Sequence, residues 1–283
     1  MRHVSAVLGV LAVFTFAQAA LAAVPDLKPE EIVAHHLDSI APTAIRGAAK
    51  SRVVQGTLKF RVPVGGGGEV NGTWGRVSSE QMSAFVMRFG VGDWHGEQFT
   101  FDGSKTGFAA ATSSHQRSDF AQFISSQDFM IKEGLLGGEY STGWALLRLE
   151  ENHARVQSIG RRKVDGRELI GLQYFSKHSS DMQVKMYFDP ETFRHVLTVY
   201  SLEIAPNMAS DVTKSASQKE IRYTLEERFG DFETTEGVTL PTSYRLQWSE
   251  ELQSGRTLLF DWQMTVTGLR DNLPLDTANF QVK

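Results

Sequence analysis

Cysteine is absent from this 283-residue chain, which excludes disulfides, thiol catalysis and thiolate metal ligands. A chain of this length can nevertheless bury a core large enough to fold without cross-links. An excess of basic charge is missing too, because 29 Lys and Arg stand against 33 Asp and Glu. We therefore expect neither nucleic acid nor an anionic membrane surface as the main partner.

Catalytic and metal-binding motifs are equally scarce. The chain has no Gly-x-Ser-x-Gly elbow and no His-Glu-x-x-His pair. Lys105–Gly107 matches a tripeptide of serine β-lactamases, but no Ser-x-x-Lys accompanies it, so we interpret it as the start of a strand. Glu226 and Glu227 are neighbours on a predicted strand and would point to opposite faces, which disfavours a carboxylate pair for glycoside hydrolysis. We expect no enzymatic activity and no cofactor.

The histidines do not form a metal site in sequence. His35 and His36 are adjacent on a predicted helix and point about 100° apart, so they are not the i, i+4 pair that a metal needs. The others have no ligand spacing and are interpreted as surface or strand residues: His95, His115, His153, His178 and His195. We therefore expect no metal.

The N-terminus resembles a secretory signal. A basic Met1–His3 precedes the apolar run Val4–Phe16, and Ala20-Leu21-Ala22 fits a cleavage site. The apolar run is short for a membrane span, so a retained anchor is the alternative to cleavage. We expect residues 1–22 to be removed near Ala22 and the mature chain, residues 23–283, to be a single exported domain.

A β-hairpin predicted between Gln183 and Tyr200 shows most clearly the pattern of apolar and polar residues in this chain. Apolar and polar residues alternate from Gln183 to Phe188 and again from Arg194 to Tyr200, which is the pattern of strands with one apolar face. Asp189 and Pro190 between them favour a tight turn. Most of the chain repeats this pattern.

The patterns predict a mainly β (α+β) fold: one large curved antiparallel sheet, or open half-barrel, of about 11–12 strands. A helix is predicted to begin at Pro29 and to end near Ala41, because Ile32, Val33 and Ile40 share a stripe. The alternation stops between Ser118 and Leu149, where short helical pieces and glycines predict a helical lid insertion. The alternative is that the last three strands form a second small sheet.

The predicted apolar face and the lid carry more large side chains than a thin sheet needs, and together they would enclose a ligand cavity. The candidate lining residues come from the strands and from the lid segment. They are Phe60, Phe85, Met87, Phe89, Phe99, Phe101, Phe120, Phe123, Phe129, Met130, Met186, Phe188, Phe260, Trp262 and Met264.

Several motifs resemble the LolA/LolB-like superfamily of periplasmic lipoprotein carriers. They are the helix start Pro29–Leu37, the glycine-rich Glu133–Gly138, the hairpins Lys163–Leu169 and Tyr187–Tyr200, and the run from Leu225 to Pro241. The likeness is closest to a branch described as outer-membrane lipoprotein-sorting proteins. The resemblance implies an open barrel that holds acyl chains beneath mobile helices. It also implies a ligand-gating arginine, for which Arg61, Arg76 and Arg88 are candidates.

The leading functional hypothesis is a non-enzymatic periplasmic carrier or binding protein for a lipid or the acyl chains of lipoproteins, acting as a monomer. One alternative is an envelope structural or interaction module with a packed core and no ligand. Another is a stress sensor that binds a peptide or an envelope protein at a sheet edge. A dry core and a ligand cavity differ in how much stability each apolar side chain contributes.

Overall fold

A computed structural model describes residues 27–64, 67–90, 94–112, 117–178, 181–205 and 220–282. The predicted signal peptide, residues 1–22, and His115 lie outside the described residues. No described helix is both long and apolar enough to cross a bilayer.

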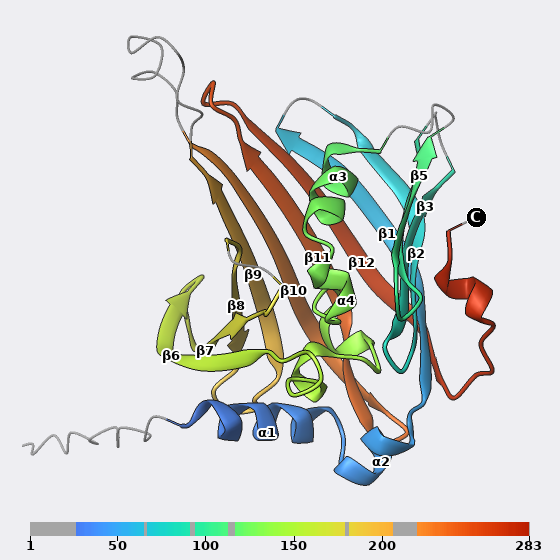
Figure 1. The fold of residues 1–283 in the computed structure, drawn as a ribbon, viewed down its shortest axis with the longest axis vertical. Coiled ribbons are helices and arrows are strands. Elements are labelled where there is room, and N and C mark those ends of the chain that lie inside the picture. Colours follow the sequence, from blue (N-terminus) through green and yellow to red (C-terminus); the bar gives the residue numbers. More distant parts are fainter. Residues whose placement is uncertain are drawn as a thin grey trace, which may run out of the picture.

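In the described part of the chain, twelve strands form one antiparallel sheet in the order β5-β4-β3-β2-β1-β12-β11-β10-β9-β8-β7-β6. The sheet curves but does not close, since β5 and β6 lie at its two ends (Figure 1). The predicted fold class is confirmed. The strands are β1 Ser51–Val64, β2 Glu69–Ser79, β3 Met82–Phe89, β4 Trp94–Phe101, β5 Thr106–Thr112, β6 Arg155–Val164, β7 Arg167–Phe175, β8 Gln183–Phe188, β9 His195–Ile204, β10 Ile221–Thr235, β11 Val238–Glu251 and β12 Thr257–Asp271.

Tight turns join most neighbouring strands, as the sequence predicts. At the β8–β9 turn, the Asp189 carboxylate accepts hydrogen bonds from the amides of Glu191 (3.1 Å) and Thr192 (2.9 Å). The Asp165-Gly166 turn has two positive φ angles, 49° and 80°, which suit the right-handed twist of a two-residue hairpin. These local turns fix the order of consecutive strands.

The last three strands do not form a second sheet, so that alternative is wrong. β12 pairs with β1 across the middle of the sheet, with Phe60 opposite Trp262 and Leu58 opposite Met264. The first and last strands of the chain thereby become central neighbours. This pairing brings apolar residues from both halves of the sequence onto the same concave face.

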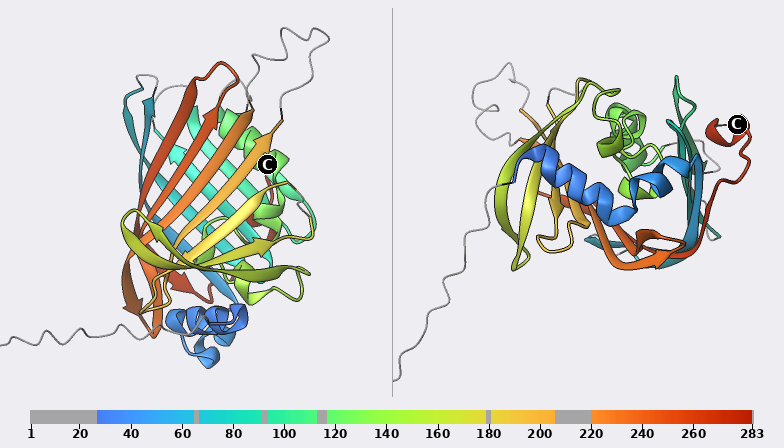
Figure 2. Two further views of the ribbon diagram at one scale, coloured as in Figure 1. Left: turned by 90° about the vertical axis from the view of Figure 1, so that its left-hand side faces the viewer. Right: turned by 90° about the horizontal axis from the view of Figure 1, so that it is seen from below.

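Helix α1, Pro29–Ile40, agrees with the predicted range and lies across one end of the curved sheet (Figure 2). It buries Ile32, Val33, His36 and Ile40. Helix α2, Thr43–Ala48, follows directly and was not predicted, because six residues after a proline show no apolar period. The 3₁₀ helix η3, Thr277–Phe280, lies against β3 and buries Phe280.

Residues 118–149, called the insertion below, lie in the hollow of the sheet (Figures 1 and 2). The insertion contains helix α3, Asp119–Ser126, helix α4, Phe129–Lys132, and two 3₁₀ turns, η1 Gly138–Tyr140 and η2 Ala145–Leu147. Ser118 caps α3 by accepting from the Ala121 amide at 3.0 Å. Most of the insertion is buried, so it forms the inner layer of the core.

Candidate functional site

The structure brings all the predicted lining residues into one apolar cluster on the concave side of the sheet. All of them are buried except Phe260, which is partly buried against the same cluster. Residues from β1, β3, β4, β8 and β12 thus meet residues of the insertion, as the alternation predicts. Their role as ligand contacts remains a prediction.

Aromatic rings form the contact between α3 and the sheet. Phe120 is fully buried, and its ring lies 4.5 Å from Trp262, 5.7 Å from Phe99 and 6.1 Å from Trp248, measured between centroids. Phe123 lies 5.9 Å from the same Trp248 ring. Among the described residues, no side chain of Asp119–Ser126 makes a hydrogen bond to the sheet. Apart from the polar contact of the cap residue Ser118 with Glu97, apolar contacts hold this helix against the sheet.

Unpaired polar atoms gather around α3. Within the described part of the chain, four buried side-chain atoms lack a hydrogen-bond partner: Arg76 Nε, Glu97 Oε2, Trp248 Nε1 and Trp262 Nε1. Both tryptophan rings contact Phe120, and the other oxygen of Glu97 accepts from the helix cap Ser118. Burial raises the pKa of Glu97 to about 8. An unpaired buried polar group costs stability, and three of these four surround one helix.

The other end of the insertion is attached to the sheet by polar contacts. The buried Glu133 carboxylate accepts from Tyr174 Oη of β7 at 2.8 Å and from Ser176 Oγ at 2.5 Å. The Glu139 carboxylate contacts His195 of β9 at 3.0 Å. These buried contacts fix residues 133–139 against β7 and β9.

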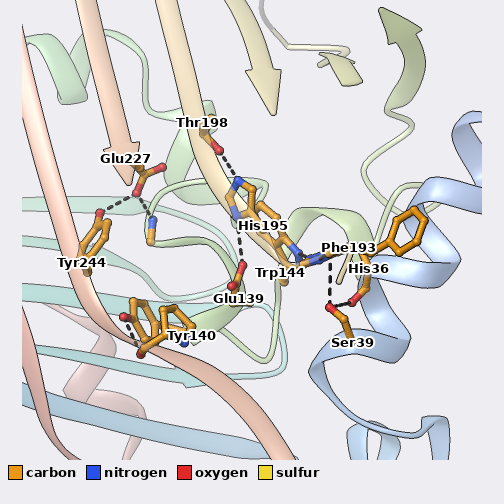
Figure 3. A network of polar contacts seen from close by, with 12 residues as sticks. His36, Ser39, Glu139, Tyr140, Trp144, Phe193, His195, Thr198, Glu227 and Tyr244 are labelled. Carbon is orange, nitrogen blue, oxygen red and sulfur yellow. Dashed lines mark hydrogen bonds and ion pairs between the residues drawn. The ribbon is translucent and has the colours of Figure 1, made fainter. Parts of the chain in front are cut away.

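Glu227 of β10 adds a third attachment (Figure 3). Its carboxylate accepts from the Gly137 amide, from Tyr244 Oη and from Tyr200 Oη, each at 2.6 Å. Burial raises the pKa of Glu227, and these three donors oppose that rise because they stabilise the anion. A buried carboxylate with three donors specifies one position for the Gly137 backbone.

Of the three candidate gating arginines, Arg76 alone reaches the insertion. Arg61 is paired with Asp261 at 2.6 Å, and Arg88 is exposed on the outer side of the sheet. Arg76 is 2% exposed and lies against Gly137, where an added Cβ would be 2.7 Å from Arg76 Nη1. Gly137 also has φ 79°, so both its backbone and its lack of a side chain are required.

Glu139, His195 and Thr198 lie in the order of a catalytic triad. His195 Nδ1 contacts the carboxylate, and His195 Nε2 lies 2.7 Å from Thr198 Oγ1 (Figure 3). In hydrolases, this order activates the hydroxyl as a nucleophile. All three side chains are at most 2% exposed, so no substrate can reach Thr198 in this conformation. The arrangement therefore joins the insertion to β9.

His36 joins α1 to the same network. Its Nε2 accepts from Trp144 Nε1 at 3.0 Å, so its Nδ1 carries the proton and donates to the Phe193 carbonyl at 3.1 Å (Figure 3). Both ring nitrogens are satisfied in the neutral form. Burial lowers the pKa of His36 to about 4. No cluster of His, Asp and Glu suited to a metal occurs among the described residues.

A groove of about 480 Å³ runs between α3 and the strands β9, β10 and β11. We call it the α3 groove. Its volume is in the range of small-molecule sites. It is lined by Asp119, Gln122, Phe123, Ser126, Gln127, Leu202, Ile204, Tyr223, Trp248 and Glu250.

Two other hollows lie elsewhere on the molecule. A cleft of about 650 Å³ beside α2 is lined largely by polar and charged side chains, including Arg46, Lys50, Glu80 and Arg148. A hollow of about 510 Å³ lies over β1 and β2 and is lined by valines and Trp74 together with polar side chains. The α3 groove differs from both because one of its walls is the helix α3.

Comparisons with solved structures find similar chains at low sequence identity. The chain is similar to a LolA superfamily protein from Nitrosomonas europaea, with 13% identity, a TM-score of 0.48, and coverage of 90% of this chain and 98% of that one. It is also similar to a DUF1329 family protein from Desulfovibrio piger, with 12% identity, a TM-score of 0.42 and coverage of 89% and 96%.

A third similar structure is a domain from Vibrio parahaemolyticus described as an outer membrane lipoprotein-sorting protein. It shares 11% identity and a TM-score of 0.40, with coverage of 89% of this chain and 96% of that one. No protein-family model matches the chain, and no curated protein matches it either. At these identities, the likeness concerns the fold alone.

Proposed function

We propose that this chain is a non-enzymatic, periplasmic binding or carrier protein for a lipid or an acylated partner, and that the acyl chain enters between α3 and the sheet. The observation that carries the proposal is the group of unpaired atoms around α3, namely Glu97 Oε2, Trp248 Nε1 and Trp262 Nε1. They lie beside a helix that is held by apolar contacts.

The chemistry of these groups suits an ester-linked acyl chain. Two indole N–H groups can donate to ester carbonyl oxygens. The apolar contacts that Phe120 and Phe123 make with the sheet can be replaced by contacts of the methylene groups of an acyl chain. Displacing α3 exchanges one set of apolar contacts for another, and the ligand satisfies donors that the protein leaves unpaired. The attached residues 133–139 need not move.

The test is native mass spectrometry of the chain secreted to the periplasm, followed by lipid extraction. We expect a bound species whose extra mass is released into organic solvent. The double variant Trp248→Phe/Trp262→Phe keeps two aromatic rings and removes both N–H groups. It should weaken binding of an ester-linked lipid by about thirtyfold, because two hydrogen bonds of about 1 kcal/mol each are lost. Binding of an alkane-like fluorescent probe should change little.

The alternative is an envelope interaction module with a dry core. The tight packing of the insertion favours it, since Phe120, Met130, Leu135, Tyr140 and Trp144 are all fully buried. A protein that carries no lipid after secretion and takes up no apolar probe would support this alternative and contradict the proposal.

The location is tested separately. Intact-mass analysis of the secreted protein should show a chain that begins at Ala23 and carries no covalent lipid. A full-length mass in the membrane fraction would indicate a retained anchor instead.

A further inference from the structure

We propose that the α3 groove binds the head group of the ligand and selects a positively charged one. The ligand would be an amphiphile whose head group is a protonated amine and whose hydrocarbon chain is buried. This inference rests on the proposed function and adds the charge of the ligand to it. It is carried by the placement of two carboxylates and an aromatic stack around the groove.

The floor of the groove is aromatic. The Tyr223 ring lies 5.4 Å from Phe123 and 6.2 Å from Trp248, with interplanar angles of 28° and 22°. Tyr223 is half-buried and so keeps part of its surface open to the groove. The face of such a ring attracts a cation within about 6 Å of its centroid.

Two carboxylates act on the same tyrosine. Asp119 lies in the first turn of α3, and Glu250 lies near the end of β11, next to Trp248 in the inward-facing row. Burial and the Glu250 carboxylate, with a smaller contribution from Asp119, raise the pKa of Tyr223 to about 12. Both acids line the same groove as Tyr223, and they approach it from different elements, α3 and β11.

No basic side chain balances these acids among the described residues that line the groove. An anionic head group would meet two negative charges there, whereas an ammonium group would meet two carboxylates and an aromatic face. The β9 residues Leu202 and Ile204 supply an apolar border, and Ile204 is 45% exposed. An amphiphile can place its amine on the acidic side and its first methylene groups on this border.

The groove also leads to the proposed acyl site. Trp248 lines the groove and contacts Phe120 beneath α3, so the two sites share this residue. A head group held beside Tyr223 leaves its chain directed along α3 toward the unpaired indole groups. One ligand would then be recognised both by the charge of its head group and by the burial of its chain.

The experiment uses the mature chain and three ligands with the same ten-carbon chain: decylamine, decanoate and decanol. Each competes at pH 7 with a neutral fluorescent probe that binds apolar sites. We expect decylamine to compete about tenfold more tightly than decanoate, from two partly exposed charge pairs and one cation–π contact. In the double variant Asp119→Asn/Glu250→Gln, the difference in affinity between decylamine and decanoate should fall below about twofold. The affinity of decanol should not change.

The matched control is Asp231→Asn/Glu233→Gln, which changes the net charge by the same amount at exposed positions of β10 outside the groove lining. It should keep the preference for decylamine. Tyr223→Leu should weaken decylamine more than decanol. Equal competition by decylamine and decanoate in the parent protein would overturn the inference and leave the proposed function standing. Failure of the probe and all three ligands to bind would overturn both.

Discussion

Two phenylalanines of α3 provide a sharp test, because they lie on the same helix in different environments. Phe120 is fully buried among Phe99, Trp248 and Trp262. Phe123 is also buried, but it forms a wall of the open α3 groove. The same change to alanine should therefore have different costs at the two positions.

For Phe120→Ala, we expect a loss of about 4 kcal/mol in the free energy of unfolding, within the range for a phenylalanine that leaves a closed void. For Phe123→Ala, we expect about 2 kcal/mol, because the lost ring widens a groove that water already reaches. The cost is then mainly the transfer of the ring, about 1.5 to 3 kcal/mol, without the full cost of a void.

The assay is urea denaturation at 25 °C and pH 7, followed by circular dichroism, with the slope m compared between variants to check that unfolding stays two-state. In parallel, a fluorescent acyl probe is titrated into each variant. Phe123→Ala should weaken the probe about fivefold or more, which corresponds to about 1 kcal/mol or more. Equal stability losses at the two positions, together with no probe binding by the parent protein, would refute the reasoning and favour a dry core.

Two further predictions concern helix α3 and the buried His36 of α1. Amide hydrogens of α3 should exchange faster than those of β12, because α3 has no side-chain hydrogen bond to the sheet among the described residues; equal protection of the two elements would contradict an opening of this helix. The stability of the protein should also fall as the pH decreases from 6.5 to about 4, because His36 is neutral in the folded state and protonated in the unfolded state over that interval. Its share is about 3 kcal/mol, and His36→Gln should reduce the dependence of the unfolding free energy on pH in this range. An unchanged pH dependence in the variant would show that other groups cause the acid sensitivity.

The strands and turns could be predicted because their signals are local. Alternation over β8 and β9 and the Asp189 turn specify a hairpin within eighteen residues. The pairing of β1 with β12 could not be predicted in the same way. The partners Phe60 and Trp262 are about two hundred residues apart. The alternation in each strand predicts a strand but does not indicate which other strand it pairs with.

The polar network escaped prediction for the same reason. His36, Glu139 and His195 each look isolated in the sequence, and they meet only after the insertion enters the sheet. One local signal was present: Glu133–Gly138 places two adjacent glycines beside acidic residues in an apolar stretch. Such a pattern indicates a backbone that passes close to other groups, as Gly137 does against Arg76 and Glu227.

The insertion is built so that its two ends respond differently to a ligand. Glu133 and Glu139 have buried partners whose separation would leave a carboxylate without its hydrogen bonds, a cost of several kcal/mol. Asp119–Ser126 has no comparable contact with the sheet among the described residues, and its apolar contacts can be replaced by those of an acyl chain. A helix that moves while the following segment stays fixed must bend between them, at Gln127 and Asp128, where the two helices are separated. The anchoring acids Glu133 and Glu139 come after this point and the replaceable contacts of Phe120 and Phe123 come before it, so ligand entry need not disturb the part that stabilises the fold.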